Sequence, residues 1–279
     1  NDYNGNRSCY AFDAGRNLET TRVEGLPAAT ACSGVIGSGA SLPSGSRKVS
    51  TEWHPDWRLP TRRSEPKKIT TWVYHGRPDP FNGNAIASCA PADALLPNGL
   101  PIAVVCKRVE QSTTDASGAA GFAATVGNGV AGNTTPAVRT VAATYNRLGQ
   151  VLTTDGPRTD VADTTTYIYH PSTTANARIG DLQSVTNALG HTTQFTQYNA
   201  HGQLLTMVDA NGVTTTMTYD ARQRLTSRSG AGRSTSYTYD PRGLLVQVVL
   251  PSGSTPNAAG AGGAAVGRAF TYTYDDAQR

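Results

Sequence analysis

The sequence has few charged residues and lacks any long apolar run. Charged residues make up 16% of its 279 positions and aromatic residues 7%, yet apolar residues still reach 38%. This balance is too uncharged for a typical disordered tail, and no run approaches the ~18 apolar residues of a membrane helix. No charged region followed by an apolar one opens the chain, so no signal peptide is expected. Glycine (29 residues) and threonine are abundant instead, which favours a soluble β protein.

Basic residues do not gather into a stripe. The net charge is only +4, and the one local cluster, Arg62-Arg63 with Lys67-Lys68, is interrupted by Glu65. Nucleic-acid binding needs a stripe of positive charge, usually with stacking aromatics. We therefore expect a solvated loop here and no nucleic-acid partner.

The sequence has no Cys-x-x-Cys pair, which argues against a zinc site. Its cysteines are Cys9, Cys32, Cys89 and Cys106. In an oxidising compartment the simplest of the three connectivities joins Cys9 to Cys32 and Cys89 to Cys106. Free buried thiols are the open alternative, because cysteine is a common small core residue.

Short polar turns recur every ten to twelve residues between residues 187 and 253. In Asp240-Pro241-Arg242-Gly243, the Asp side chain can cap the turn, the proline φ is already set, and glycine accepts a positive φ. This predicts a type I turn followed by a bulge, closing a β-hairpin. The same pattern recurs at residues 146–149, 187–190, 199–202 and 209–212. At 220–223 Gln223 replaces the glycine, at a cost of about 1 kcal/mol if it takes the left-handed conformation.

The runs between the turns read as strands. Val213, Thr215, Met217 and Tyr219 fall on one face at a period of two, with threonines on the other. Tyrosines then recur at a basal period of about twenty residues, one hairpin per repeat, with insertions in the loops. The first copy, near Tyr10, has a turn one residue shorter. The predicted repeat positions are Tyr10, Asp13, Tyr145, Asn146, Gly149, Tyr167, Tyr169, Tyr198, Asn199, Gly202, Tyr219, Asp220, Tyr237, Tyr239, Asp240, Gly243, Tyr272, Tyr274 and Asp275.

We expect three regions. Residues 1–111 form a degenerate repeat block with loops and the four cysteines, and residues 112–137 are a low-complexity excursion. Residues 138–279 are a regular repeat block that stops within a repeat, so we expect a fragment of a longer product. Within the first region, residues 102–105 are predicted to form a buried strand, and residues 33–46 a loop.

Only a few polar residues are candidates for a catalytic or metal-binding role. His54, Asp56 and His75 lie in one segment without a nucleophile at informative spacing, so they are predicted to be turn and surface residues. His170 stands where other copies have Asp or Asn, and we expect a turn residue there too. No catalytic residue, metal site or cofactor is predicted.

The recurring tyrosine-aspartate pattern carries a family resemblance. Residues 237–245 and 219–225 resemble the signature Tyr-x-Tyr-Asp-x-x-Gly-Arg-Leu of the RHS/YD-repeat family, with Met217 and Leu244 as departures. The resemblance implies an all-β spiral of antiparallel hairpins that closes into a hollow shell, as in bacterial RHS polymorphic toxins and toxin-complex subunits. Some members cut themselves at a paired Asp-Pro-x-Gly site. Here that motif occurs once, at residues 240–243, and we expect a turn without proteolytic activity.

Two functions follow as hypotheses. In the first, the chain is a structural shell wall and not an enzyme. It encloses a C-terminal toxin outside these residues, is secreted or at the cell surface by type VI or another route, and has as partners the rest of its polypeptide and secretion or cell-surface components. In the second, it is a cell-surface repeat that binds carbohydrate or a partner protein through Trp53, Trp57 and Trp72.

Overall fold

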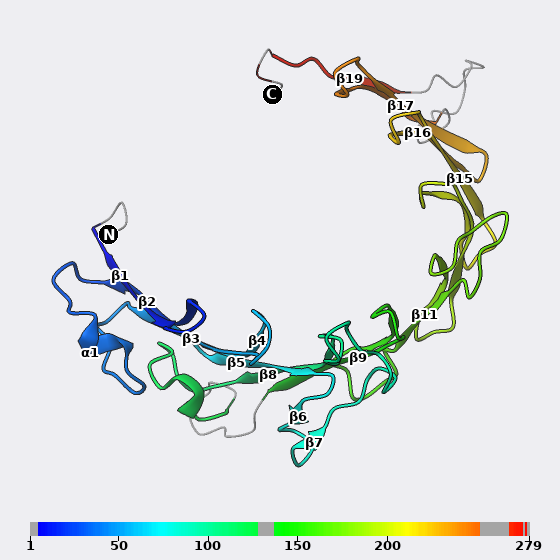
Figure 1. Cartoon of the computed structure of the whole chain (residues 1–279). Helices are drawn as coiled ribbons and strands as arrows, with labels where there is room; N and C mark the ends of the chain where they lie inside the picture. The colour runs from blue at the N-terminus through cyan, green and yellow to red at the C-terminus, as the bar shows by residue number, and fades with distance from the viewer. Residues whose placement is uncertain (1–4, 128–136, 252–267, 276, 278–279) are drawn as a thin grey trace. The chain divides into compact units, whose positions relative to one another are not determined.

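The computed structural model describes residues 5–127, 137–251, 268–275 and 277 (Figure 1). In these residues the regular structure is almost all antiparallel β-sheet, as predicted. The chain forms two compact units, residues 1–164 and 165–279, which are described separately. Among the described residues, no helix has the length and apolar character to cross a membrane. The three regions expected from the sequence, with boundaries at residues 112 and 138, were defined by how regular the repeats are. They stay a prediction.

The first unit is built on one antiparallel sheet. Its strand order is β1-β2-β3-β4-β5-β8-β9-β10. The strands are β1 (Arg7–Asp13), β2 (Leu18–Leu26), β3 (Arg47–Trp53), β4 (Pro60–Glu65), β5 (Lys68–Tyr74), β8 (Val105–Ser112), β9 (Val138–Tyr145) and β10 (Val151–Asp155). A separate hairpin of β6 (Pro78–Asp79) and β7 (Ala85–Ile86) interrupts the order between β5 and β8.

Short inserted elements cover this sheet. The helix α1 (Ser33–Ile36), the 3-10 helix η1 (Gly121–Ala123) and the β6–β7 hairpin lie along the same side of the strands (Figure 1). Under α1, Cys9, Val23, Leu26 and Val35 form a buried cluster. Removing such side chains from water is the main favourable term in folding. The core of this unit therefore lies between the sheet and its insertions.

The low-complexity segment is part of that cover. The Lys48 amide donates to the Ser117 carbonyl at 2.8 Å, and the Ser64 hydroxyl donates to the Gly121 carbonyl at 2.9 Å. Residues 113 and 126 also form a β-bridge with each other. The first part of the segment is thus fastened to β3 and β4, whereas residues 128–136 lie outside the described residues.

Three local expectations need correction. The basic cluster was expected in a solvated loop, but Arg62 and Arg63 lie in β4 and Lys68 begins β5, with only Lys67 in the turn between them. Residues 102–105 were expected as a buried strand, but β8 begins only at Val105, and these residues are half-buried. The Ile102 amide donates to the Ala94 carbonyl and the Val104 amide to the Ile102 carbonyl, so local turns use the groups that a strand would pair. The loop expected at residues 33–46 contains the single turn of α1.

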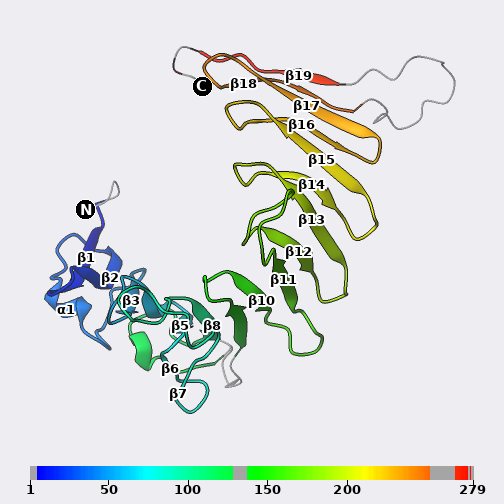
Figure 2. The same cartoon turned by 45° about the vertical axis from the view of Figure 1, so that its right-hand side comes forward.

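The second unit is a plain meander. Each strand from β11 to β19 pairs with the next along the chain, and they lie side by side in sequence order (Figure 2). The strands are β11 (Thr165–Tyr169), β12 (Leu182–Thr186), β13 (Thr192–Tyr198), β14 (Leu204–Val208), β15 (Thr214–Tyr219), β16 (Leu225–Gly230), β17 (Arg233–Tyr239), β18 (Leu245–Val249) and β19 (Ala269–Thr271). Among its described residues, Ala177 alone is buried. On β15, the alternation of Thr214, Thr216 and Thr218 outward is as expected.

Candidate functional site

The repeated turn is held by its first side chain. At residues 240–243 the Asp240 amide donates to the Leu244 carbonyl at 2.9 Å, and the Gly243 amide donates to the Asp240 carbonyl at 3.0 Å. Asp240 Oδ1 accepts the Leu244 amide at 2.8 Å, and Gly243 has φ +99°. A register shift follows in the flanking strands, which is the predicted turn and bulge. The same backbone bonds start at Asn146, Asn187, Asn199, Asp209 and Asp220.

These turns fall on two edges of the sheet. Because successive strands are antiparallel, the turns at residues 199–202, 220–223 and 240–243 lie on one edge. Those at 187–190 and 209–212 lie on the opposite edge. Only the first set follows a repeat tyrosine. The period of about twenty residues therefore contains one turn of each kind.

Among the described residues, six tyrosines close the open end of the strand pair to which they belong. The Tyr219 hydroxyl donates to the Leu204 carbonyl at 3.0 Å, and Leu204 is the first residue of the neighbouring strand β14. In all six bonds the acceptor is the first residue of the preceding strand in the sheet. The bonds are Tyr74 to Pro60, Tyr145 to Val105, Tyr198 to Leu182, Tyr219 to Leu204, Tyr239 to Leu225 and Tyr274 to Leu245. We call this set the tyrosine links.

Burial strengthens the proton affinity of two of the linking hydroxyls. It raises the pKa of Tyr74 and the pKa of Tyr198 to about 12. For Tyr198 the nearby Asp181 carboxylate also raises the pKa, because it disfavours a second negative charge. These hydroxyls therefore remain hydrogen-bond donors across the physiological pH range.

A charged pair reinforces one turn and reaches the next repeat. Arg224 lies 2.6 Å from Asp220, and its guanidinium carbon lies 4.4 Å from the ring centre of Tyr239. The side-chain hydrogen bond from Arg224 lowers the pKa of Asp220. In an earlier copy Asn199 and Gln203 form the neutral equivalent, with the amide nitrogen and oxygen 2.9 Å apart. Both pairs connect the turn's first residue to the residue just before the next strand.

Three histidines occupy the Asp position of expanded turns. His54 follows Trp53, His75 follows Tyr74, and His170 follows Tyr169. Their amides donate to the carbonyls of Leu59, Val104 and Asp181, each directly before a sheet strand. Trp53 also takes the tyrosine role, because its indole N–H donates to the Glu19 carbonyl at 2.9 Å. In all three copies an aromatic residue is followed directly by His. The sequence pattern placed only His170 in a repeat.

The proposed surface location of His54 and His75 is wrong. They are only 4% and 8% exposed. His54 Nδ1 accepts the Asp56 amide at 3.2 Å, as a capping Asp oxygen would, and its ring meets Tyr74 edge-on at 5.3 Å. Burial lowers the pKa of His54, and Arg77 adds to that effect. These three predicted residues are not brought together as one catalytic set: His54 and Asp56 share a turn, and His75 begins another.

The first repeat copy differs from the prediction. Asn17 donates its amide to the Asp13 carbonyl at 2.8 Å and has φ +52°, so the left-handed residue comes four positions after Asp13. The turn is therefore one residue longer than later ones, not shorter. Its aromatic residues, Tyr10 and Phe12, are 46% and 54% exposed.

The remaining predicted repeat positions lie in strands, in turns or directly after β19. Tyr167 pairs with Val185 across β11 and β12, and Tyr237 pairs with Val248 across β17 and β18. The Tyr272 amide donates to the Val246 carbonyl at 2.9 Å, and Asp275 follows the last link tyrosine. Gly149 and Gly202 both have φ +79° at the turn position that needs it.

Both cysteine pairs are disulfides in the structure. Cys9–Cys32 joins β1 to the start of α1 inside the buried cluster. Cys89–Cys106 joins the loop after β7 to β8. The Cys89 carbonyl also accepts the Tyr145 amide at 2.7 Å, so this disulfide positions a loop that supports a repeat tyrosine.

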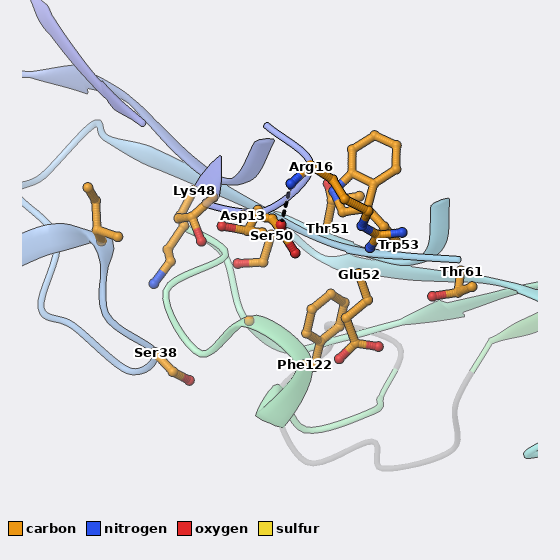
Figure 3. A pocket seen from close by; sticks show the side chains of 14 residues that line it. Asp13, Arg16, Ser38, Lys48, Ser50, Thr51, Glu52, Trp53, Thr61 and Phe122 are labelled. Carbon is orange, nitrogen blue, oxygen red and sulfur yellow. Dashed lines mark hydrogen bonds between the residues drawn. The ribbon is translucent and has the colours of Figure 1, made fainter. Parts of the chain in front are cut away.

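A polar pocket of about 560 Å³ opens on the first unit (Figure 3). Asp13, Ser50, Trp53 and Phe122 are among the side chains that line it, from β1, β3 and η1. Lys48, at 1% exposure, also lines the pocket and donates to the Gly37 carbonyl. Burial lowers the pKa of Lys48, and Asp115 partly opposes that shift.

The side chain of Asp240 in the Asp-Pro-x-Gly motif is hydrogen-bonded within its own turn. Burial alone would raise the pKa of Asp240, but hydrogen bonds from the Leu244 amide and Arg242 lower it. Its two carboxylate oxygens accept those two partners at 2.8 and 3.0 Å. The Pro241 carbonyl accepts a bond from Arg222 of the previous turn. Asp240 thus holds the turn and is an ionised acceptor there.

Comparison with known proteins agrees with this repeat. The RHS Repeat family model matches residues 198–234 and 219–255, the block with the most regular turns. Among curated protein sequences none matches this chain.

The chain is also similar to solved toxin-complex structures. A crystal structure of TcdB2-TccC3 with Cdc42 has a TM-score of 0.56 at 16% identity, covering 97% of this chain and 12% of that one. A structure of the Photorhabdus luminescens Tc holotoxin pore with mutated TccC3 has a TM-score of 0.54 at 16% identity, covering 98% and 11%. The chain thus spans about an eighth of the length of these similar chains. Residues 198–255 are RHS repeats, and the chain has the fold of an RHS-repeat shell segment.

Proposed function

We propose that this chain is a wall segment of an RHS-repeat shell that encloses a C-terminal toxin domain outside residues 1–279. The observation that carries the proposal is the series of tyrosine links. Each one joins the end of a hairpin strand to the start of its neighbour, so the sheet can be extended repeat by repeat. A structure of this kind can enclose a volume by adding repeats, without a catalytic group of its own.

The instability of a single hairpin supports a wall of many repeats. A single hairpin is marginally stable in water, and pairing with neighbours satisfies its strand edges. In the second unit every described inner strand has a neighbour on each side. We propose that the partners of the outer strands are further repeats of the same polypeptide.

We propose that the whole protein is secreted or displayed at the cell surface. Two disulfides support an oxidising destination. The similar structures are toxin complexes that contain TcdB2 and TccC3. By analogy, the further partners of this chain are export or cell-surface components, type VI machinery among them. The role of the chain itself is structural and not enzymatic.

The test is the gene that encodes the chain. We expect its reading frame to continue past Arg279 through more repeats into a domain without the repeat. A frame that stops after one more capping strand would contradict encapsulation. If a domain follows, limited proteolysis of the full-length protein should leave it intact until the repeats are unfolded, whereas the same domain expressed alone should be cleaved at once.

A second candidate is carbohydrate binding at the pocket in Figure 3. An aromatic side chain, Trp53, lies there beside the Asp13 carboxylate and the Thr51 hydroxyl, which are suitable partners for sugar hydroxyls. Trp72 lies in another pocket, which Trp53 also lines. A glycan array probed with the chain and with its Asp13→Asn variant would test it. Saturable binding that the variant loses would favour this function, and no binding would exclude it.

A further inference from the structure

His75 lies against one of the two disulfides. It follows the link tyrosine Tyr74 at the end of β5, and its Nδ1 accepts the Cys89 amide at 3.3 Å. A ring nitrogen of His75 and the Sγ atoms of Cys89 and Cys106 all lie within 4.8 Å of one another. His75 and Cys106 are each 8% exposed, and Cys89 is half-buried. One imidazole and two sulfurs therefore meet in a nearly closed site.

We propose that reduction of Cys89–Cys106 converts this site into a Zn²⁺ site with His75, Cys89 and Cys106 as ligands. When a phosphine reduces the disulfide, the S–S bond breaks and the sulfurs receive two electrons and two protons. The phosphine takes its oxygen from water and leaves as the phosphine oxide. The two thiols then release two protons as Zn²⁺ binds both thiolates and the neutral imidazole. A water molecule completes the fourth position.

The distances suit this change. Zinc binds sulfur at about 2.3 Å and imidazole nitrogen at about 2.0 Å, so tetrahedral ligands lie roughly 3.5–3.8 Å apart. The bonded sulfurs, 2.01 Å apart here, must separate to that spacing. All three ligand atoms already lie within 4.8 Å, so the histidine needs only a small movement. The bond from the Cys89 amide to Nδ1 is 3.3 Å, which is long for a hydrogen bond, so it holds the imidazole ring only weakly against this movement.

The other disulfide provides an internal control. Cys9–Cys32 lies in the apolar cluster with Val23 and Leu26. Within the described ranges, His75, Cys89 and Cys106 are the one set of three His, Cys, Asp or Glu residues whose ligand atoms all lie within 4.8 Å of one another, and neither Cys9 nor Cys32 belongs to it. Reduction of both disulfides should therefore create one metal site and not two.

The consequence is a loop that stays fastened in either redox state. Residues 75–106 leave the sheet after β5 and return at β8, and the Cys89 carbonyl holds the Tyr145 amide. In an oxidising medium the disulfide closes this loop. In a reducing medium the zinc ion would close it through the same two sulfurs. This inference does not depend on whether the shell encloses a toxin.

The experiment uses the whole chain, reduced by tris(2-carboxyethyl)phosphine and titrated anaerobically with Co²⁺ as a spectroscopic substitute for Zn²⁺. We expect one Co²⁺ per reduced chain, with thiolate-to-cobalt charge-transfer absorption that Zn²⁺ abolishes. The oxidised chain should give no such band. The Cys9→Ser/Cys32→Ser variant should bind as the wild type does, and the Cys89→Ser/Cys106→Ser variant should not.

His75→Gln separates a built site from a pair of free thiols. We expect its Co²⁺ affinity to be at least about tenfold weaker. Unchanged affinity in this variant, or equal binding by the Cys89→Ser/Cys106→Ser variant, would overturn the proposal. Amide-exchange protection of β5 and β8 is measured in the same reduced samples. Binding that occurs only when this protection is lost would also overturn it, because an unfolded chain would then be the ligand.

Discussion

The two units build different structures from the same repeat. The first buries a cluster under α1 and contains both disulfides, while among the described residues of the second only Ala177 is buried. Both units have the tyrosine links and the capped turns. The repeat is therefore sufficient for a sheet one layer thick, whereas a core requires the insertions between its strands.

The difference follows from where the repeat puts its bonds. Turn caps and tyrosine links satisfy backbone groups at the ends of the strands, which would otherwise have to bond to water. They do not cover a sheet face. In the first unit α1, η1 and the segment from residue 112 provide that cover. The free energy of unfolding should thus depend mainly on buried apolar side chains in the first unit. In the second unit it should depend mainly on the hydrogen bonds of the turn caps and tyrosine links.

The largest expected effect is the loss of the disulfides. They span 23 and 17 residues, and closing such loops stabilises a protein by about 3 kcal/mol each. Reduction in the presence of a metal chelator should lower amide-exchange protection in β1–β5 and β8–β10 and leave β12–β18 unchanged. Equal loss in both units would show that their stabilities are not separate.

The next effect compares two leucines. Leu26→Ala should destabilise the first unit by about 2–5 kcal/mol, because Leu26 is fully buried and truncation leaves a cavity. Leu225→Ala should cost less than half as much, because Leu225 is only half-buried. Urea unfolding followed by exchange in each unit measures both. A larger effect at Leu225 would contradict the one-layer description of the second unit.

Removing a single link hydroxyl should have a smaller effect. Tyr219→Phe or Tyr239→Phe loses one hydrogen bond to a backbone carbonyl, and each should cost about 1 kcal/mol. Tyr237→Phe is the matched control, because the Tyr237 hydroxyl makes no hydrogen bond to the described residues. It should change the free energy of unfolding by less than about 0.5 kcal/mol.

Alkaline pH should weaken both units through the same residue type. The pKa of Tyr74 and the pKa of Tyr198 are raised from 10.0 to about 12. A raised folded pKa contributes stability that is complete below pH 10 and is lost as the pH rises toward 12. Tyrosinate absorbance and urea midpoints across this window should change together. Phe at either position should reduce the pH dependence, and an unaltered slope would contradict the assignment.

The smallest effect is a gain of stability. Gln223 has φ +66° where the related turns have glycine. Gln223→Gly should stabilise the second unit by about 0.5 kcal/mol, because relief of left-handed strain exceeds the entropy cost of glycine. Its backbone carbonyl still accepts the Gln203 side chain. Gly243→Ala, measured by the same urea unfolding, should have the opposite sign.

Much of the fold could be predicted from the sequence. The turns at residues 199–202 and 240–243 depend on four adjacent residues, and the strands between them on alternation, so both are local properties. The tyrosine positions were also visible as a period. Their partners were not, because Tyr219 and its acceptor Leu204 belong to different repeats.

The sequence by itself determined the antiparallel repeat, because turn chemistry and alternation act over a few neighbouring residues. Tertiary structure alone decided which residues the long loops bring together. Only there does His54 become a buried capping residue, and only there does His75 lie against Cys89 and Cys106. The reason is physical: the path of a long loop depends on its contacts with distant strands, and no spacing along the chain encodes those contacts.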